Sequence, residues 1–593
     1  MATLVERRRP TVDSELMRRV TLAFLLVTVL LFATNIAAIA GTRFPDPDDT
    51  LRLVQVRDLV AGQGWFDLNQ YRVDAAGGGV AMHWSRLVDI PLALVIMAFT
   101  PLVGQANAEM VALIGVPILT FGIAIFLAGR IAWRLLNEEA TTFACLAMAL
   151  SVPVVAQLRP LRIDHHGWQI VLALAAANGL MARSPRVGGW LIGLALATWL
   201  SISIEGLPLA VAFVAICALR WLRREEDKIW LISTMQALAL GSAALFAGTR
   251  GFGDLATYCD AITPVHLAIF GWGALALTGL GALGRHPWPF TLAGFAVTGA
   301  GAAGIVALGA PQCAGGSFVA LDPLVREFWY LGVGEGLPVW QQPLDVALQV
   351  VVPPLIGLWT AFRLARTTND WLQRFWIDYT LLLAAALLVA CFVSRAGAVT
   401  GALAAVPLGW QIREWIRSAR MMANSGKRAL ALAGVAIVLV PAMPVTLFTM
   451  AVPARAEAVS ANTTRASTCH IPDATNVLRG LPQGEILAPL DIGPRLVYET
   501  QHSVIATGHH RGSDAMRLVI EAFLGSQEDA QALVSQRGTS YVAICPDLGE
   551  PALYFESARD GFAAQLIAGD APDWLEPVAM PEGVGFRIWK IKG

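Results

Sequence analysis

Charged residues are scarce in this chain of 593 residues: they make up 15% of it, whereas a soluble domain carries about a quarter. Basic charge is not in excess either, because 43 Lys and Arg face 44 Asp and Glu and leave a formal net charge of −1. The sequence has no tract of Lys and Arg with interleaved aromatic residues, and no Cys-x-x-Cys pair. These absences argue against a nucleic-acid partner and against a zinc-ribbon type of metal site.

Apolar residues are abundant instead, at 56% of the chain with a mean hydropathy of +0.58. Stretches of about 20 apolar residues recur from Val20 to Met450, and each is long enough to cross a hydrocarbon core of about 30 Å. They stop after Ala451, and the remaining mixed sequence is long enough for one globular domain. The sequence therefore predicts a polytopic α-helical membrane protein with about 13 transmembrane helices over residues 1–451, followed by a soluble α/β domain over residues 452–593.

Basic residues set the expected orientation. The N-terminus carries five arginines before the first apolar run and has no signal-peptide cleavage site, which indicates an uncleaved first span with its basic end in the cytoplasm. Residues 90–103 are short for a span and hold two prolines, so we expect an interfacial or re-entrant helix there. We divide residues 188–222 into two spans at 201–206, which keeps Arg223 and Arg224 cytoplasmic. The soluble domain then faces the periplasm of a bacterial inner membrane.

Acids and histidines gather in the loops that this topology places outside. These loops span residues 41–89, 159–167, 250–266 and 311–345, with a further short turn at Arg395; together with its interfacial helices, the first external segment covers residues 41–110. A transporter is expected to place ionisable groups near the middle of its helices. Their position at span ends indicates chemistry at the external surface of the membrane.

The first external loop opens with three carboxylates within four residues, Asp46, Asp48 and Asp49. Oxygen ligands of this kind suit Mg²⁺ or Mn²⁺. The alternative is an acidic turn that caps a helix over residues 49–60, because Asp is a strong N-cap.

A second cluster, Asp164, His165 and His166, lies between two predicted spans. An aspartate and a histidine two residues apart can turn towards one ion if the segment is extended. The alternative is a polar helix end with histidines at the level of the lipid headgroups. Glu327 and Glu335, in the loop 311–345, are candidates to complete a metal shell or are solvated loop acids.

Arg395 lies at a predicted outer helix end, where it could hold a phosphate of a lipid donor or extend to the interface like many membrane arginines. In the C-terminal domain, residues 485–490, 495–499 and 539–544 are expected to form strands, and residues 513–524 and 527–536 helices. His509 and His510 are either structural or accessory to the membrane site. Cys469 and Cys545 are expected to form a disulfide, and Cys259 and Cys313, both on outside loops, a second one.

The order of these parts resembles the catalytic subunit of oligosaccharyltransferases of the bacterial and archaeal single-chain type, which belong to the GT-C glycosyltransferase superfamily. Residues 46–52 are similar to the start of the first loop in that family, so the resemblance gives Asp46 the role of a metal-binding aspartate. Residues 79–84, which include His83, resemble a Gly-containing stretch that precedes the family's interfacial helix.

The other motifs extend this resemblance. Asp164-His165-His166 is similar to the Asp-His-His of archaeal members, with Asp164 and His166 as the ligand pair. Val333-Gly334-Glu335 matches the end of a Thr-x-x-Glu motif and favours Glu335 over Glu327. Arg395 takes the place of an arginine that contacts the donor phosphate.

The resemblance implies transfer of a sugar or oligosaccharide from a polyprenyl-phosphate or polyprenyl-diphosphate donor. Mg²⁺ or Mn²⁺ would be held by Asp46, Asp164, His166 and Glu335, and Asp48 or Asp49 would be the base or would orient the acceptor. The family's Trp-Trp-Asp-Tyr-Gly motif, which recognises the acceptor sequon, is absent, so another acceptor is expected: a glycan, a lipid or a different protein site. The competing hypotheses are a transporter or flippase of lipid-linked glycans and a non-catalytic scaffold.

Overall fold

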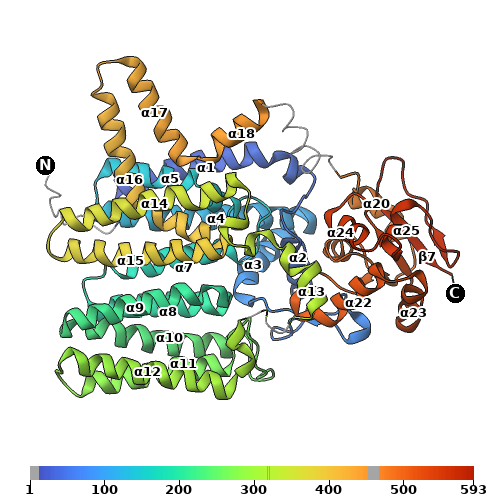
Figure 1. Cartoon of the computed structure of the whole chain (residues 1–593), viewed down its shortest axis with the longest axis horizontal. Coiled ribbons are helices and arrows are strands. Elements are labelled where there is room, and N and C mark those ends of the chain that lie inside the picture. The colour runs from blue at the N-terminus through green and yellow to red at the C-terminus, as the bar shows by residue number, and fades with distance from the viewer. Residues whose placement is uncertain (1–11, 317, 319–320, 452–466, 593) are drawn as a thin grey trace. The chain divides into compact units, whose positions relative to one another are not determined.

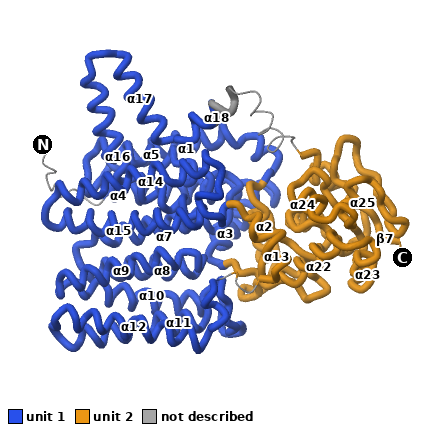
Figure 2. The backbone as a smooth tube through the Cα atoms, viewed as in Figure 1, with its two compact units in different colours: residues 1–43, 85–317, 335–450 blue, residues 44–84, 318–334, 451–593 orange. Residues whose placement is uncertain are grey.

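A computed structural model describes residues 12–316, 318, 321–451 and 467–592 of the chain. The chain divides into two compact units (Figure 2). Unit 1 comprises residues 1–43, 85–317 and 335–450, and unit 2 comprises residues 44–84, 318–334 and 451–593. The first external loop thus belongs to the same unit as the C-terminal domain.

Unit 1 consists of helices, most of which are long and apolar (Figure 1). In chain order they are α1 (Ser14–Ala40), α3 (Arg86–Val103), α4 (Gln105–Leu135), α5 (Glu138–Leu150), α6 (Val152–Ala156), α7 (His166–Gly179), α8 (Pro185–Ile202), α9 (Leu207–Arg223), α10 (Lys228–Thr249), α11 (Pro264–Ala282), α12 (Trp288–Gly309), α14 (Leu344–Thr367), α15 (Asp370–Phe392), α16 (Gly397–Arg420), α17 (Ser425–Leu439) and α18 (Ala442–Ala451). Helices α8, α10, α11 and α12 pack one against the next. Such a bundle satisfies every backbone group within its own helices, as a bilayer requires.

Within the described residues, nine helices are long and apolar enough to cross a membrane. They differ in burial: the most apolar window of α12 buries none of its residues, whereas half of the corresponding window of α4 is buried. Helix α12 therefore offers its side chains to lipid, and α4 lies inside the bundle. The polytopic helical fold is confirmed, while the total of about 13 spans stays a prediction.

The division of residues 188–222 into two helices is confirmed. Helix α8 ends at Ile202, a 3-10 turn covers Ile204–Gly206, and α9 follows with a proline in its first turn. Gly206 is required here, because a Cβ atom at this position would lie 2.4 Å from the indole nitrogen of Trp199. Close packing of the turn on that indole therefore fixes the break between the helices.

Two helix boundaries differ from expectation. Helix α3 begins at Arg86, four residues before the apolar run, and its 18 residues qualify it as a candidate span. The helix is therefore longer than the apolar run indicated, and an interfacial or re-entrant position for residues 90–103 stays a prediction. The apolar run over about residues 143–155 predicts a span, but it is broken, because α5 ends at Leu150 and a short helix, α6, starts again after Ser151 with a proline in its first turn.

Unit 2 contains a five-stranded sheet with helices packed on it. Its strands are β3 (Glu485–Leu487), β4 (Ser503–Val504), β5 (Tyr541–Ile544), β6 (Leu575–Pro577) and β7 (Arg587–Ile591), in the order β4-β3-β5-β7-β6. Strand β3 pairs parallel with β4 and β5, and β7 pairs antiparallel with β5 and β6. All residues of β3 and β5 are buried, as expected for central strands covered on both faces.

The helices of unit 2 are short. They are α2 (Pro47–Val60), α13 (Pro323–Phe328), α20 (Ile471–Gly480), α21 (Gly493–Glu499), α22 (Ser513–Leu524), α23 (Gln527–Arg537), α24 (Gly549–Ser557) and α25 (Phe562–Ala568). Helices α22 and α23 confirm the predicted ones. The expected strand at 495–499 is wrong, because Pro494 at the start of α21 favours a helix, which an Arg495–Glu499 salt bridge of 2.6 Å then supports.

The first external loop is built into this domain. Helix α2 packs against α21, and a small hairpin of β1 (Asn69–Gln70) and β2 (Val80–Ala81) follows it. The backbone of Asp74 donates to Val504, and Val504 donates to Arg72, so the loop continues the edge of the sheet. The predicted disulfides Cys259–Cys313 and Cys469–Cys545 are both present, one in each unit.

Candidate functional site

Charged side chains from four separate turns of unit 1 meet where its helices end. Arg162, Asp164 and His165 lie in the turn before α7, and His166 is the first residue of that helix. Glu205 lies in the turn between α8 and α9, Glu335 in the turn Gly334–Gly336, and Arg395 in the turn Ser394–Ala396 before α16. Helix ends separated by up to 230 residues therefore build one cluster, which we call the charged cluster.

Asp164 has two roles in this arrangement. Its Oδ1 atom accepts a hydrogen bond of 2.9 Å from the backbone N–H of His166, which fixes the carboxylate at the start of α7. Its Oδ2 atom lies 3.0 Å from the Arg162 guanidinium and 3.6 Å from Nε2 of His166. The hydrogen bond to Oδ1 caps the start of α7, and the two contacts of Oδ2 direct that oxygen into the charged cluster.

Glu335 lies on the other side of the same two partners. One of its oxygens is 3.6 Å from Nε2 of His166, and the other is 3.6 Å from the Arg162 guanidinium. Glu335 was preferred over Glu327 from the sequence, and Glu327 is an exposed residue of α13 in unit 2. Unit 1 thus brings together Asp164, His166 and Glu335.

The sequence analysis did not select Glu205, although it belongs to the charged cluster. Its Oε1 accepts a hydrogen bond of 2.9 Å from Arg395, and its Oε2 accepts one of 3.2 Å from Gln169. The same oxygen lies 3.5 Å from Nε2 of His165. The sequence held one indication of this role, because Glu205 is an acid in the short turn 201–206, which the predicted topology places on the outer side. Arg395 also lies 3.9 Å from Glu335, so it links the two acids.

Three carboxylates face two guanidinium groups in the charged cluster, which leaves one net negative charge when the histidines are neutral. Burial is the largest single influence on Asp164 and opposes its ionisation, but Arg162, the two histidines and the backbone N–H of His166 together outweigh it and lower the pKa of that carboxyl. Burial also acts on Glu335, where His166, Arg395 and Arg162 together lower the pKa to about 2. Burial and the neighbouring His166 lower the pKa of His165. The acids are therefore ionised and the His165 imidazole is neutral, which are the forms that bind a metal cation. Burial acts against a charge on His166, but Asp164 and Glu335 outweigh it and raise the pKa of His166 to about 9, so a metal ion that binds this ring displaces a proton from it.

The spacing of these groups suits a single divalent ion. Ligand atoms about 2.1 Å from one ion lie roughly 3.0 to 3.5 Å from one another in octahedral or tetrahedral arrangements. The Nε2 atom of His166 is 3.6 Å from an oxygen of Asp164 and from one of Glu335. Asp164, His165 and His166 can each offer a ligand atom within 4.8 Å of the others. A mixed set of carboxylate oxygens and imidazole nitrogen fits Mn²⁺, with small movements of the side chains, whereas Mg²⁺ prefers oxygen ligands alone.

The three aspartates of the first loop belong to unit 2. Asp46 is the N-cap of α2, where its side chain accepts a hydrogen bond of 2.9 Å from the N–H of Asp48. The capping alternative thus holds for Asp46, and the helix begins two residues earlier than expected. Asp49 is fully buried within α2. A part for Asp46 in metal binding stays a prediction from the sequence.

Asp48 is paired with a predicted accessory histidine. Nε2 of His509 lies 3.1 Å from Oδ1 of Asp48, and Nδ1 of the same ring lies 2.8 Å from the Thr507 hydroxyl. The edge of the His509 ring meets Trp84 at a centroid distance of 5.0 Å. Asp48 is partly exposed and His509 is buried, so the contact joins the surface of unit 2 to its interior.

The other predicted histidines, His83 and His510, also lie in unit 2. Their rings are 4.7 Å apart, and His510 meets Phe318 at 4.9 Å. This stacking gives both rings a packing role. It assigns no chemistry to them.

A second pair of acids in unit 2 predicts a dependence of stability on pH. The Glu550 carboxylate accepts hydrogen bonds from the N–H groups of Leu490 and Asp491 and from the Tyr554 hydroxyl. Burial and the neighbouring Asp491 raise the pKa of Glu550 to about 7. Because the pKa in the folded state is the higher one, stability present below about pH 4.5 is lost as the pH rises through about 7.

We therefore expect the free energy of unfolding of unit 2 to fall by about 1 to 2 kcal/mol between about pH 5 and pH 8. Scanning calorimetry of the detergent-purified chain would measure this change. The two N–H groups donate to different oxygens of Glu550, so Glu550→Gln keeps an acceptor for only one of them and should lower stability at every pH. Because Gln cannot ionise, the variant should still flatten the dependence on pH. An undiminished dependence in this variant would assign the effect to other groups.

No family model matches the chain, and no curated protein matches it by sequence. Solved structures do match. The archaeal oligosaccharyltransferase AglB from Archaeoglobus fulgidus, in complex with an inhibitory peptide and a dolichol-phosphate, superposes with a TM-score of 0.66 at 13% identity, over 95% of this chain and 72% of that one. The apo form of the Archaeoglobus fulgidus oligosaccharyltransferase gives the same TM-score and identity, over 89% of this chain and 69% of that one.

A more distant match is the arabinofuranosyltransferase AftD from Mycobacteria, with a TM-score of 0.50 and 13% identity over 97% of this chain and 40% of that one. These likenesses confirm the fold expected from the order of spans and loops. The chain has the GT-C glycosyltransferase fold, in the form found in oligosaccharyltransferases.

Proposed function

We propose that the chain is a membrane glycosyltransferase that moves a sugar or oligosaccharide from a polyprenyl-phosphate or polyprenyl-diphosphate donor to an acceptor on the periplasmic side of a bacterial inner membrane. The charged cluster at the helix ends of a GT-C fold is the observation that carries the proposal. Among the similar structures, AglB was solved with a dolichol-phosphate, and the Archaeoglobus fulgidus enzyme with Zn and sulfate and with a tethered acceptor peptide.

The residues of unit 1 divide the work on the donor. Arg395 donates a hydrogen bond to Glu205 through one Nη atom, and its planar guanidinium matches the oxygens of a donor phosphate. Asp164, His166 and Glu335 are the residues that would hold Mg²⁺ or Mn²⁺, with Asp46 as a further predicted ligand. A bound divalent ion would supply Lewis-acid neutralisation of the departing phosphate.

The acceptor nucleophile needs a base, and unit 2 offers one. His509 is oriented by Thr507 on one ring nitrogen and by Asp48 near the other, an arrangement that lets the pair take up a proton. Because unit 2 lacks the Trp-Trp-Asp-Tyr-Gly sequon motif, the proposed acceptor is a glycan, a lipid or a protein site other than that sequon.

The position of the charges also separates this proposal from a flippase. A flippase would need polar groups along its helices near the midplane. Here the carboxylates and guanidinium groups of the charged cluster lie in turns and at helix ends. That placement favours chemistry on a headgroup over passage of one across the membrane.

Removal of divalent ions is expected to stop turnover of the donor. The assay follows release of polyprenyl phosphate or polyprenyl diphosphate, according to the donor, from a radiolabelled lipid-linked donor fraction in membranes that contain the protein and its native acceptor, so the acceptor need not be identified. We expect EDTA to lower the rate by at least about a hundredfold, and Mn²⁺ or Mg²⁺ to restore it. Glu327→Gln, which alters an exposed acid of the same external loop, should respond as wild type. A rate unchanged by EDTA would contradict the metal-dependent proposal.

A further inference from the structure

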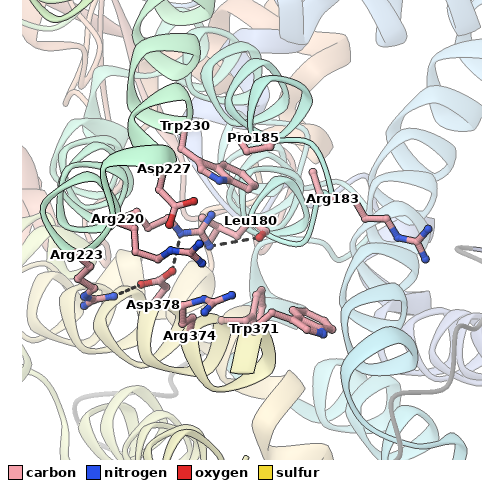
Figure 3. A pocket seen from close by; sticks show the side chains of 13 residues that line it. Leu180, Arg183, Pro185, Arg220, Arg223, Asp227, Trp230, Trp371, Arg374 and Asp378 are labelled. Carbon is pink, nitrogen blue, oxygen red and sulfur yellow. Dashed lines mark hydrogen bonds and ion pairs between the residues drawn. The ribbon is translucent and has the colours of Figure 1, made fainter. Parts of the chain in front are cut away.

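A second set of charged side chains lines a pocket at the other end of the helices that carry the charged cluster (Figure 3). Helix α9 starts beside the Glu205 turn and ends at Arg223, which lines the pocket. Its 17 residues span about 26 Å, close to the thickness of a hydrocarbon core of about 30 Å. Helix α15 runs between the same two places, from the pocket to the turn of Arg395. The pocket and the charged cluster therefore belong to opposite membrane surfaces.

The pocket is small and basic. Its volume is about 190 Å³, room for roughly six water molecules at about 30 Å³ each. Its arginines are Arg183, Arg220, Arg223, Arg224 and Arg374. The lining also holds two aspartates, so five positive charges face two negative ones and leave a net charge of +3. A cavity of this size and charge suits a single phosphate-bearing group.

Part of the lining is fixed by a buried carboxylate. Asp378, whose side chain is 1% exposed, accepts hydrogen bonds of 2.6 Å from Arg220 and 2.9 Å from Arg223. Arg220 also donates to the carbonyl of Leu180 and lies 4.3 Å above the Trp230 ring. Figure 3 shows these contacts on one wall of the pocket. Two arginines are thus held in place before any ligand arrives, which lowers the entropy lost on binding.

One other arginine is placed to meet a ligand. Within the described part of the chain, neither Arg183 nor Arg374 has a carboxylate within 4.0 Å. Figure 3 shows Arg374 between Asp378 and Trp371, whereas the Arg183 side chain points away from the other arginines. Arg374 is therefore the arginine to replace when binding is tested, because its guanidinium faces the pocket and does not hold the pocket together.

We propose that this pocket binds the phosphate of an anionic phospholipid headgroup, at the membrane surface opposite to the charged cluster. Guanidinium groups match phosphate oxygens in pairs, and basic pockets between transmembrane helices on the cytoplasmic side hold anionic headgroups. Trp371 and Trp230 in the lining add the amphipathic rings typical of headgroup level. The proposal does not depend on the reaction carried out at the other surface.

The test uses the full-length protein in nanodiscs of phosphatidylcholine with a minor fraction of phosphatidylglycerol. Native mass spectrometry counts the phosphatidylglycerol molecules that the protein retains. A basic side chain near the membrane surface contributes about 1 kcal/mol to binding of an anionic lipid, so Arg374→Gln should weaken retention about fivefold. Arg374→Lys, which keeps the charge, should recover part of the loss. Arg366→Gln, an exposed arginine of α14 outside the pocket, should retain lipid as wild type does.

A second arm separates a lipid from a soluble phosphate. Inorganic phosphate is titrated onto the protein in nanodiscs of phosphatidylcholine alone, and thermal stability is recorded. The ligand would be a soluble phosphate and not a lipid if phosphate stabilises the protein, Arg374→Gln abolishes this stabilisation, and the protein shows no preference for phosphatidylglycerol. The pocket is not a phosphate site if Arg366→Gln lowers lipid retention as much as the pocket substitution does. The same conclusion follows if the wild-type protein neither retains phosphatidylglycerol nor is stabilised by phosphate. Equal melting temperatures of all variants in phosphatidylcholine confirm that the substitutions leave the fold intact.

Discussion

Asp164→Asn is expected to lower the rate of donor turnover by about a thousandfold or more, and to remove binding of Mn²⁺ by the purified protein. The carboxylate directs its Oδ2 atom into the charged cluster, between the Arg162 guanidinium and the His166 ring. An amide there offers no negative charge to a metal ion. It also leaves the charged cluster with two acids against two arginines, so the attraction for a cation is lost.

The substitution is conservative for the fold. The Oδ1 atom of Asp164 accepts the backbone N–H of His166, and the amide oxygen of Asn can accept the same hydrogen bond. A loss of function without a change in melting temperature would therefore report on the charge alone. Calorimetric titration with Mn²⁺ measures binding, and release of polyprenyl phosphate measures turnover. Glu327→Gln is the matched control, and unchanged Mn²⁺ binding in Asp164→Asn would place the ion elsewhere.

The long helices could be predicted because length and apolar composition are local properties of the sequence. The break between α8 and α9 followed from the basic residues after it, and the structure confirms it at Ile204–Gly206. The errors arose where local patterns compete. Residues 495–499 hold a short run of Leu, Val and Tyr that is typical of a buried strand, but the preceding Pro494 starts a helix. The turn before α6 interrupts a run that is apolar throughout, so hydropathy alone gave no sign of it.

The candidate site was predicted in part for a different reason. Asp164, His166, Glu335 and Arg395 were selected by their order along a chain that resembles a known family, and unit 1 places these four close together. Glu205 is one acid in a short turn, so no motif singled it out. Its role depends on three contacts, with Arg395, His165 and Gln169, which tertiary structure alone creates. The pairing of Asp48 with His509 likewise joins distant parts of the chain.

Arg395→Gln is expected to weaken binding of polyprenyl phosphate by about 10-fold to 100-fold, because a charge-assisted hydrogen bond contributes about 1.5 to 3 kcal/mol. Turnover at saturating donor should fall less than affinity, since Arg395 acts on a phosphate that is already charged in the ground state. Arg326→Gln, an exposed arginine of α13, serves as the control.

A double-mutant cycle with Glu205 tests how Arg395 is positioned. Glu205 holds Arg395 through one hydrogen bond of 2.9 Å, and neighbouring charges of this kind couple by about 0.5 to 3 kcal/mol. If Glu205 orients the guanidinium, Arg395→Gln should cost at least about threefold less affinity for polyprenyl phosphate in a Glu205→Gln background than in wild type. If the cost is larger instead, Glu205 competes with the phosphate for Arg395. In that case its function is to release the arginine only when donor arrives, and the positioning role is wrong.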